Sequence, residues 1–559
     1  MKQSESKEGI VLRNSSDSSD GWRNDGQEDE DCVDGIRETI EEKVKKCFRK
    51  HDDTFEDEIN VTETDNESFS FKKLWQFTGP AFIMCIAYID PGSIQADLQT
   101  GTVAGYRLMW LLLVSTIFGI IVQRLASRLG LVTSCHLAES CHNTYPLIAQ
   151  YILWIFAEAA IILTNVQEVI GTAVAIYILS DAAIPIFAGI IITIIDTLLF
   201  LLLSNYGLRK LELLFGILIA IMIQSFGSEY VKMKPDTSQV LKGLVIPWCL
   251  NCSKGAFKRA VFIVGSTIMP QNLYLHSALV TSRKVDRSKP EEIKDANRYE
   301  LINLITAFVV TFLINVGITS VFAAELHGKT NLDIHNLCAE SNYTRRDEYV
   351  FQQNNKTVEI NLYNAGVFLA CRFPAKIAWP MYAWAIGLFA SGLSSTMSGT
   401  YTGQFVMFGF LKIKMLKWKR ILLTRSIAIV PTLIIAFFTN INNLSQSIDF
   451  INAIMSLLLP FALIPLLTLT SSQEIMGEFK NGYITIIITS LILLLTIALN
   501  SFFIHVFFFN FNPQWYTITL SVIMLLVYIS LILYLVCFYD NFLLLTEQIF
   551  CRFGVRCKF

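Results

Sequence analysis

The chain has 559 residues, of which 53% are hydrophobic and 16% are charged, and its formal net charge is -2. With a mean hydropathy of +0.47, this composition excludes an ordinary soluble globular protein. We therefore expect nearly all of the length to be membrane domain, with a lipid bilayer and no nucleic acid around it.

Residues 1–70 are acidic, as in the run Glu28-Asp29-Glu30-Asp31, and contain few large apolar side chains. This pattern predicts a disordered cytosolic tail. No apolar run follows a basic start, so we expect no cleavable signal peptide. The first span must then act as both signal and anchor.

Apolar runs near 20 residues predict an all-α membrane domain over 71–545, followed by a short cytosolic tail over 546–559. We count twelve spans. They lie near residues 75–97, 106–128, 149–179, 184–204, 209–227, 258–282, 300–324, 379–410, 421–440, 449–471, 482–506 and 515–538.

The first span is interrupted at Asp90-Pro91-Gly92. A carboxylate at bilayer depth is costly unless a partner or an ion compensates it, and the Pro-Gly pair removes helical hydrogen bonds. Irregular backbone is tolerated at that depth where it lines a cavity or is buried in protein. Secondary transporters hold cations with such broken helices. The break therefore predicts a cation site with free backbone carbonyls.

A second break, at Met269-Pro270-Gln271-Asn272, falls in the sixth span. Breaks in spans one and six occupy corresponding positions in two five-helix halves. A repeat with an odd number of helices inserts with opposite topology. The sequence therefore predicts inverted repeats that face each other across a site at the membrane midplane.

Short loops rich in lysine and arginine give the orientation. The basic loops at 283–298 and 411–420 fall on the same side as Arg124, Arg128 and Lys210. We expect that side and both termini to be cytosolic. Residues 325–378 then form an exterior loop.

Two acceptor sequons, at Asn342 and Asn355, fit N-glycosylation of this exterior loop. Four cysteines on the exterior side allow two disulfides in an oxidising compartment. They are Cys338 and Cys371 in the 325–378 loop, and Cys249 and Cys252 in the loop before it. The rival interpretation of the second pair is half of a zinc site, for which no companion pair lies nearby.

Several motifs, taken in order, resemble the natural resistance-associated macrophage protein (Nramp) family, and animal divalent metal transporters in particular. They are the Asp-Pro-Gly break and the stretches 167–171, 269–279 and 399–404. The similarity runs from about Leu74 to Phe538. It implies a LeuT-type fold of two inverted five-helix repeats plus two helices, and proton-coupled import of Fe²⁺ or Mn²⁺.

The resemblance also implies a set of metal ligands. Asp90 matches the family's aspartate ligand, Met269 its thioether ligand, and Ala87 a position whose carbonyl binds metal. Ser266 stands where the family has an alanine that offers its carbonyl. Ser93 replaces an asparagine, so the coordination sphere is either smaller or completed by water.

The chemistry of this set favours a transition metal as cargo, with no resident cofactor. A thioether contributes little to Mg²⁺ or Ca²⁺ but suits Fe²⁺, Mn²⁺, Co²⁺ and Cd²⁺. We expect Asp90 to supply charge attraction and Met269 selectivity. The alternative is that Met269 fills core space, as most methionines do.

The positions that the resemblance assigns to proton transfer depart from the family. Gln271 replaces a histidine, Asn165 an aspartate and Gln95 a glutamate, while Leu458 replaces a glutamine near the metal. Amides preserve packing and hydrogen bonds but cannot gain or lose a proton near neutral pH. These changes predict weakened proton coupling.

Six titratable groups remain for the proton route and gating, namely Asp90, Asp97, Glu158, Glu168, His276 and Arg425. Glu168 and Arg425 match the family's proton route and inner gate, and an intramembrane acid and base need each other. His276 either titrates or makes a structural hydrogen bond. Asp97 belongs to the same set, although pairing at a helix interface is its stronger role, and Asp90 is shared with the metal.

Three functions stay open. The first is a transition-metal importer with weakened proton coupling. The second is a broad-range Mg²⁺-type uniporter, which Ser93 and the amides favour and Met269 opposes. The third is a non-transporting metal sensor or scaffold. No nucleotide loop, nucleophile elbow or zinc-hydrolase signature suggests an enzyme. We expect a monomer in the plasma membrane or in an endosomal or lysosomal membrane.

Overall fold

The computed structural model describes residues 59–60, 69–193, 195, 208–247, 254–341, 350–373, 379–412, 419, 423, 426–427, 429–430, 432–434, 441–509 and 515–537. The predicted spans at 184–204 and 421–440 are described only in part. Four residues with predicted roles lie outside the described residues: Arg425, Asn342, Cys249 and Cys252.

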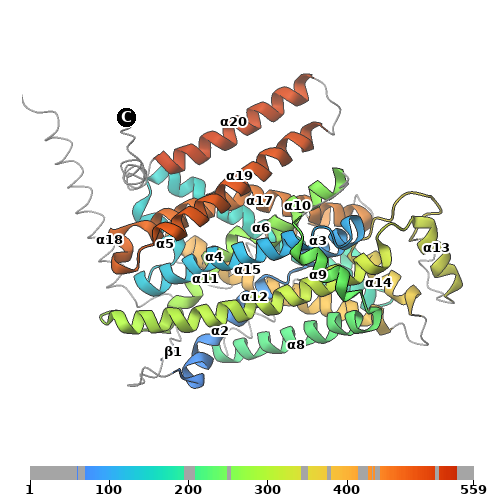
Figure 1. Ribbon diagram of the computed structural model, residues 1–559, viewed down its shortest axis with the longest axis horizontal. Helices are drawn as coiled ribbons and strands as arrows, with labels where there is room; N and C mark the ends of the chain where they lie inside the picture. Colours follow the sequence, from blue (N-terminus) through green and yellow to red (C-terminus); the bar gives the residue numbers. More distant parts are fainter. Residues whose placement is uncertain are drawn as a thin grey trace, which may run out of the picture.

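The described chain is mainly helical (Figure 1). Its first helices are α2 (Phe71–Ala87), α3 (Pro91–Ala104), α4 (Met109–Thr133), α5 (Leu137–Thr144), α6 (Leu147–Leu179), α8 (Leu208–Met233), α9 (Thr237–Val245), α10 (Lys254–Thr267) and α11 (Pro270–Leu279). Later helices are α12 (Pro290–Leu326), α13 (Asn331–Glu340), α14 (Leu362–Arg372), α15 (Trp379–Leu411), α17 (Ile441–Ser471), α18 (Gln473–Met476), α19 (Tyr483–Phe509) and α20 (Trp515–Cys537). Short 3₁₀ turns, η1 (Val280–Ser282) and η2 (Gly477–Phe479), follow α11 and α18, and β1 (Ile59–Asn60) pairs in parallel with β2 (Arg283–Lys284).

Both predicted breaks are confirmed, and they are built alike. The first broken helix divides into α2 and α3, and the second into α10 and α11. Asp90 and Met269 occupy the N-cap positions of α3 and α11, and each is followed by a proline in the first helical turn. Proline is suited to that position because its missing N–H has no partner within the helix anyway.

Seven helices of the described part are long and apolar enough to cross a membrane. They are α4, α6, α12 and the segments Glu212–Met233, Gln446–Ser471, Tyr483–Val506 and Ile518–Val536. The halves of the broken helices have 17, 14, 14 and 10 residues, so each is shorter than a full membrane span. Figure 1 shows these helices running side by side, with α19 and α20 along one edge.

The segment 325–378, predicted as an exterior loop, contains the helices α13 and α14. Helix α14 is buried from Leu362 to Cys371 and packs against α15 and α6. Asn361 caps it by accepting a hydrogen bond from the backbone N–H of Asn364 at 2.7 Å. Its apolar and small side chains explain why it joins the helix bundle.

Glycines allow the broken helices to approach their neighbours closely. A β-carbon at Gly265 on α10 would lie 2.0 Å from the carbonyl oxygen of Asn452 on α17, and one at Gly101 on α3 would lie 2.3 Å from that of Thr319 on α12. No larger residue fits at either distance. The backbones around the two breaks are therefore held in direct contact with their neighbours.

Candidate metal centre

Asp90 is fully buried at the end of the first break. Its Oδ1 accepts a hydrogen bond from the backbone N–H of Ser93 at 2.8 Å, as expected of an aspartate N-cap. Its Oδ2 has no hydrogen-bond partner in the described part of the chain. One carboxylate oxygen is thus fixed by the helix, and the other is available to a cation.

Side chains donate to the carbonyls that the first break removes from helical hydrogen bonding. The carbonyl of Ala87 accepts from the Asn272 amide at 3.1 Å, and that of Ile89 accepts from the Ser391 hydroxyl at 2.6 Å. The Ser93 hydroxyl donates to the carbonyls of Tyr88 and Asp90. Buried carbonyls must be satisfied, and polar side chains of three helices do this here.

Met269 is fully buried at the second break. Its sulfur accepts a hydrogen bond from the Gln271 amide at 3.2 Å, and the same amide donates to Thr164 on α6 at 2.7 Å. Asn272, two residues after Pro270, donates from its side-chain amide to the carbonyl of Ala87 at the first break. The two breaks are therefore in direct contact.

Ser266 lies one residue before the end of α10, and its hydroxyl donates to the carbonyl of Ile263 at 3.1 Å. No cluster of three or more His, Cys, Asp or Glu residues suited to a metal occurs among the described residues. A centre at the breaks would therefore combine one carboxylate, one thioether and backbone or hydroxyl oxygens. Such a mixed set has lower charge than an oxygen-rich Ca²⁺ cage and includes a soft donor.

Side chains that the sequence analysis did not single out also position the first break. The Asn452 amide donates to the carbonyl of Gly92 at 3.0 Å and accepts from the Gln167 amide at 2.8 Å. The feature of the sequence that could identify Asn452 is a lone amide in an apolar span. For Ser391 it is the run of small polar residues from 391 to 399, which is typical of close helix packing.

Glu168 and Asn165 lie one turn apart on α6, and both are buried. A β-carbon at Gly399 on α15 would lie 3.0 Å from the Asn165 side-chain oxygen and 3.4 Å from a Glu168 carboxylate oxygen. Both side chains therefore face α15. Arg425, the predicted partner of Glu168, lies outside the described residues, so their pairing stays a prediction.

His276 is fully buried between two helices. Its Nδ1 lies 2.9 Å from Gln123 on α4, and its Nε2 lies 2.9 Å from the carboxylate of Glu300 on α12. Gln123 in turn contacts the hydroxyl of Tyr88 at the first break. Both ring nitrogens are therefore engaged, and the chain of contacts leads from the break to Glu300.

Two further predicted positions have structural partners. Gln95 accepts a hydrogen bond from the backbone N–H of Leu362 at 3.1 Å, which ties α3 to the start of α14. Asp97 faces Asn315 on α12. Leu458 on α17 belongs to the buried core that also contains Met269.

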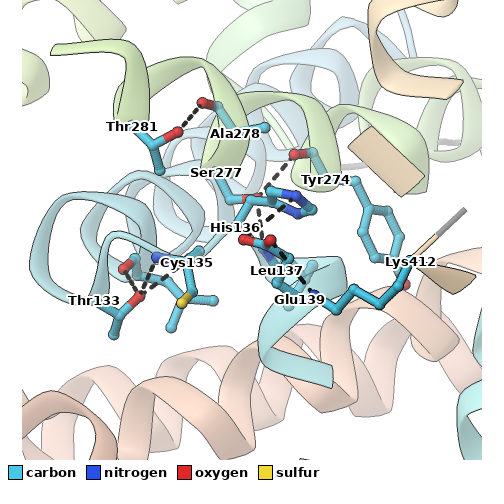
Figure 2. A network of polar contacts seen from close by, with 11 residues as sticks. Thr133, Cys135, His136, Leu137, Glu139, Tyr274, Ser277, Ala278, Thr281 and Lys412 are labelled. Carbon is cyan, nitrogen blue, oxygen red and sulfur yellow. Dashed lines mark hydrogen bonds and ion pairs between the residues drawn. The ribbon is translucent and has the colours of Figure 1, made fainter. Parts of the chain in front are cut away.

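Helix α11, the second half of the second broken helix, is anchored to α5, as Figure 2 shows. The hydroxyl of Ser277 on α11 accepts from the backbone N–H of Leu137 at 2.9 Å. Beside it, the Glu139 carboxylate lies 3.6 Å from His136 and 3.5 Å from Lys412 at the end of α15. These contacts hold α5, α11 and α15 together.

At the opposite end, a disulfide joins Cys338 on α13 to Cys371 on α14, which confirms that predicted pair. Near it, a cavity of about 530 Å³ lies between the end of α3 and the segment 350–361. Amide side chains line most of it, and its acidic and basic members are Glu359 and Lys356. Asn355, the described sequon residue, falls in the same segment.

Known proteins are similar to this chain in both sequence and fold. The family model described as natural resistance-associated macrophage protein-like matches residues 81–506. Natural resistance-associated macrophage protein 2 of Rattus norvegicus is 49% identical over 454 residues, which are 81% of this chain and 79% of that protein. The NRAMP-like transporter smf-1 of Caenorhabditis elegans is 44% identical, and the match covers 89% of each chain.

Among solved structures, a manganese transporter from Eremococcus coleocola superposes with a TM-score of 0.72 at 28% identity. The match covers 87% of this chain and 99% of that one. The family model covers most of the chain, and both broken helices are in place. The chain therefore belongs to the natural resistance-associated macrophage protein (Nramp) family, and it is an all-α membrane protein with the LeuT-type inverted-repeat fold.

Proposed function

We propose that this protein imports divalent transition-metal ions, Fe²⁺ or Mn²⁺ first and Co²⁺ or Cd²⁺ also, into the cytosol by alternating access. The single observation that carries the proposal is the buried Asp90, with one unpartnered carboxylate oxygen, at a break in contact with the break that holds Met269. The family relatives include a protein named as a transporter and a structure named as a manganese transporter.

The ligands would be Asp90, Met269 and oxygens of Ala87, Ser93 and Ser266. Each of these oxygens keeps a lone pair after the hydrogen bonds described above, because a carbonyl or hydroxyl oxygen has two. The soft sulfur of Met269 favours a transition metal over Mg²⁺. This donor set supports an importer more strongly than it supports a Mg²⁺-type uniporter.

Weakened proton coupling is part of the proposal. Gln271 contacts both the Met269 sulfur and Thr164, and Asn165 lies beside Glu168. Both amides stand where the family resemblance implies groups that titrate. Glu168, Arg425 and His276 are the titratable groups that we assign to the remaining proton route and to gating.

The surroundings follow from the same proposal. We propose both termini in the cytosol, glycans on Asn342 and Asn355, and a plasma or endosomal membrane. The Cys338–Cys371 disulfide supports an oxidising environment for that end of the molecule. Each chain contains its own pair of breaks, which supports a monomer that binds the metal ion, with protons as a second substrate.

The test is uptake of radioactive Mn²⁺ and Fe²⁺ into liposomes that contain the protein, with the internal pH recorded and protein-free liposomes as the control. We expect both ions to enter the liposomes even in the presence of excess Mg²⁺. The liposome lumen should acidify only a little. If Mg²⁺ competes with Mn²⁺ and Fe²⁺ on equal terms and suppresses their entry, the result would support the Mg²⁺-type uniporter. Binding of Mn²⁺ without entry would support the sensor.

A further inference from the structure

We propose that Asp97 is a proton-binding site linked electrostatically to the metal site, and that Asn315 is its partner in both protonation states. This inference deepens the proposed function and rests on it. It places a proton site on the interface between α3 and α12, away from the amides of α6 and α11.

Asp97 is 3% exposed, in the outer half of the first broken helix on the proposed orientation. Its carboxylate makes no ion pair among the described residues. Its polar contact is Asn315: with the amide turned so that nitrogen faces the carboxylate, Asn315 donates to Asp97 at 3.3 Å and to the carbonyl of Thr311 at 3.3 Å. One neutral donor leaves a buried carboxylate poorly compensated.

An amide can serve either protonation state of such a group. Its NH₂ donates to the carboxylate, and after rotation its oxygen accepts the proton of the carboxylic acid. Rotation of the Asn315 amide exchanges its nitrogen and oxygen, and the atom that faces Asp97 lies 3.3 Å from the carboxylate oxygen. Asn315 can therefore donate to the carboxylate or accept from the carboxylic acid. Asp97 can therefore gain or lose a proton without repacking of α3 against α12.

Polar groups continue from Asp97 toward the outer end of this interface. Thr319, one turn beyond Asn315, is 1% exposed and its hydroxyl has no partner in the described chain. Gly101 on α3 brings the two backbones together at that level. His327, just after α12, is exposed, and its Nδ1 lies 3.2 Å from the carbonyl oxygen of Thr102. These groups mark a path for protons from outside.

Charged groups on the helices around α3 are engaged elsewhere. Arg259 on α10 pairs with Asp449 on α17 at 2.6 Å, and Glu325 on α12 pairs with Arg372 on α14 at 3.0 Å. On α6, Glu168 faces Gly399 of α15. The titratable thiol of Cys85, on α2, contacts Thr311.

Asp90 is the charged group of the proposed metal site, and it caps the helix that carries Asp97. Asp97 follows Asp90 by seven residues, two helical turns, so both lie on one side of the helix at a separation of about 10 Å along its axis. A divalent cation at Asp90 reverses the sign of the local field. Metal binding therefore favours release of the Asp97 proton, and by linkage the proton weakens metal binding.

The experiment measures proton release when Mn²⁺ binds to the purified full-length protein, by calorimetry in buffers of different ionisation enthalpy between pH 5.5 and 7.5. The unmodified protein should release protons. Asp97→Asn should bind Mn²⁺ but release fewer protons, whereas Asp97→Glu should restore the release. Asn315→Leu removes the donor that stabilises the Asp97 carboxylate. Proton release on Mn²⁺ binding should therefore persist in this variant to a pH about one unit higher than in the unmodified protein.

Unchanged proton release in Asp97→Asn, or no release from the unmodified protein, would overturn the inference while leaving metal transport intact. If Asp97→Asn does not fold, an unchanged pH range for Asn315→Leu overturns it equally. Failure of the unmodified protein to bind or import Mn²⁺ would instead remove the proposed function. The two failures are therefore distinguishable.

Discussion

At Asp90, the two oxygens of one carboxylate have separate tasks. Oδ1 caps α3 through the backbone N–H of Ser93, whereas Oδ2 has no partner among the described residues. A buried acceptor without a donor is costly, and nearly all buried groups avoid it. We interpret the unpartnered oxygen as the place where a cation compensates the charge.

Asp90→Ala should therefore abolish metal uptake while the protein still reaches its membrane. The substitution removes the only fixed negative charge among the proposed ligands. Radioactive Mn²⁺ uptake, normalised to surface protein, is the measurement. Asp286→Ala, at an exposed loop acid, is the matched control and should retain uptake. Near-normal uptake by correctly localised Asp90→Ala would refute the site.

Met269→Ala should change the selectivity among metal ions more than the total rate of uptake. An oxygen-dominated site would lose its preference for Cd²⁺ and admit Ca²⁺ or Mg²⁺ more readily. The change at stake is about 1–2 kcal/mol, or roughly tenfold to thirtyfold in the ratio of affinities. Competition between Cd²⁺ and Ca²⁺ during uptake measures it.

The matched control is Met222→Ala, because Met222 is equally buried but lies on α8. This variant should lose stability without a change in ion preference. If Met269→Ala keeps the Cd²⁺ to Ca²⁺ ratio of the unmodified protein, its sulfur only fills space in the core.

At the scale of elements, both broken helices are predictable from local chemistry. A proline directly after Asp90 or Met269 ends one helix and starts the next, whatever the surroundings. The hydrogen bonds that occupy the break are not predictable in this way. Ser391 and Asn452 lie hundreds of residues away, and only the packed helices bring them to these carbonyls.

Helix α14 was missed for a related reason. Its sequence follows two sequons and is too short to span a membrane, so its position between spans predicted a loop. Burial against α15 and α6 gives it stability that length alone does not. The pair Cys338 and Cys371 was predictable, because both cysteines share one segment between two spans.

Gly265→Ala tests the close approach of α10 to α17. The added β-carbon would lie 2.0 Å from the backbone oxygen of Asn452, so the helices must separate. We expect the free energy of unfolding to fall by about 1–3 kcal/mol, as for an overpacked core, and the Tm in detergent to fall with it. Uptake should fall as well, because Asn452 also binds the first break.

Gly227→Ala, on α8, is the control for this prediction. A β-carbon there meets nothing within 4 Å. Alanine favours helix over glycine by about 1 kcal/mol, so this variant should be neutral or slightly stabilised. Equal Tm values for the two variants would show that α10 tolerates a wider separation from α17.

For the whole molecule, the amides predict loose coupling between metal and proton movement. Gln271, Asn165 and Gln95 cannot change charge near neutral pH. Lowering the external pH from about 7.5 to 5.5 should raise Mn²⁺ uptake only a few-fold, since these three positions carry amides that cannot take up a proton. The measurement is simultaneous recording of Mn²⁺ entry and lumenal pH in liposomes.

Gln271→His combined with Asn165→Asp should steepen this pH dependence. The replacements restore titratable groups beside Met269 and Glu168. Gln271→Asn alone is a useful comparison, because it changes the side chain at this position without adding a titratable group. A fixed ratio of protons to Mn²⁺ in the unmodified protein would contradict loose coupling.

The hydrogen bonds that fill the candidate centre also bear on how fast an ion leaves it. Gln271 donates to the sulfur of Met269, and Asn272 donates to the carbonyl of Ala87. An ion bound at the proposed site would share the sulfur and the carbonyl oxygen with these two amide donors, because each acceptor keeps a second lone pair. Sharing the electron density of these atoms would lower the net affinity and shorten the residence time of the ion, which would suit rapid turnover better than storage.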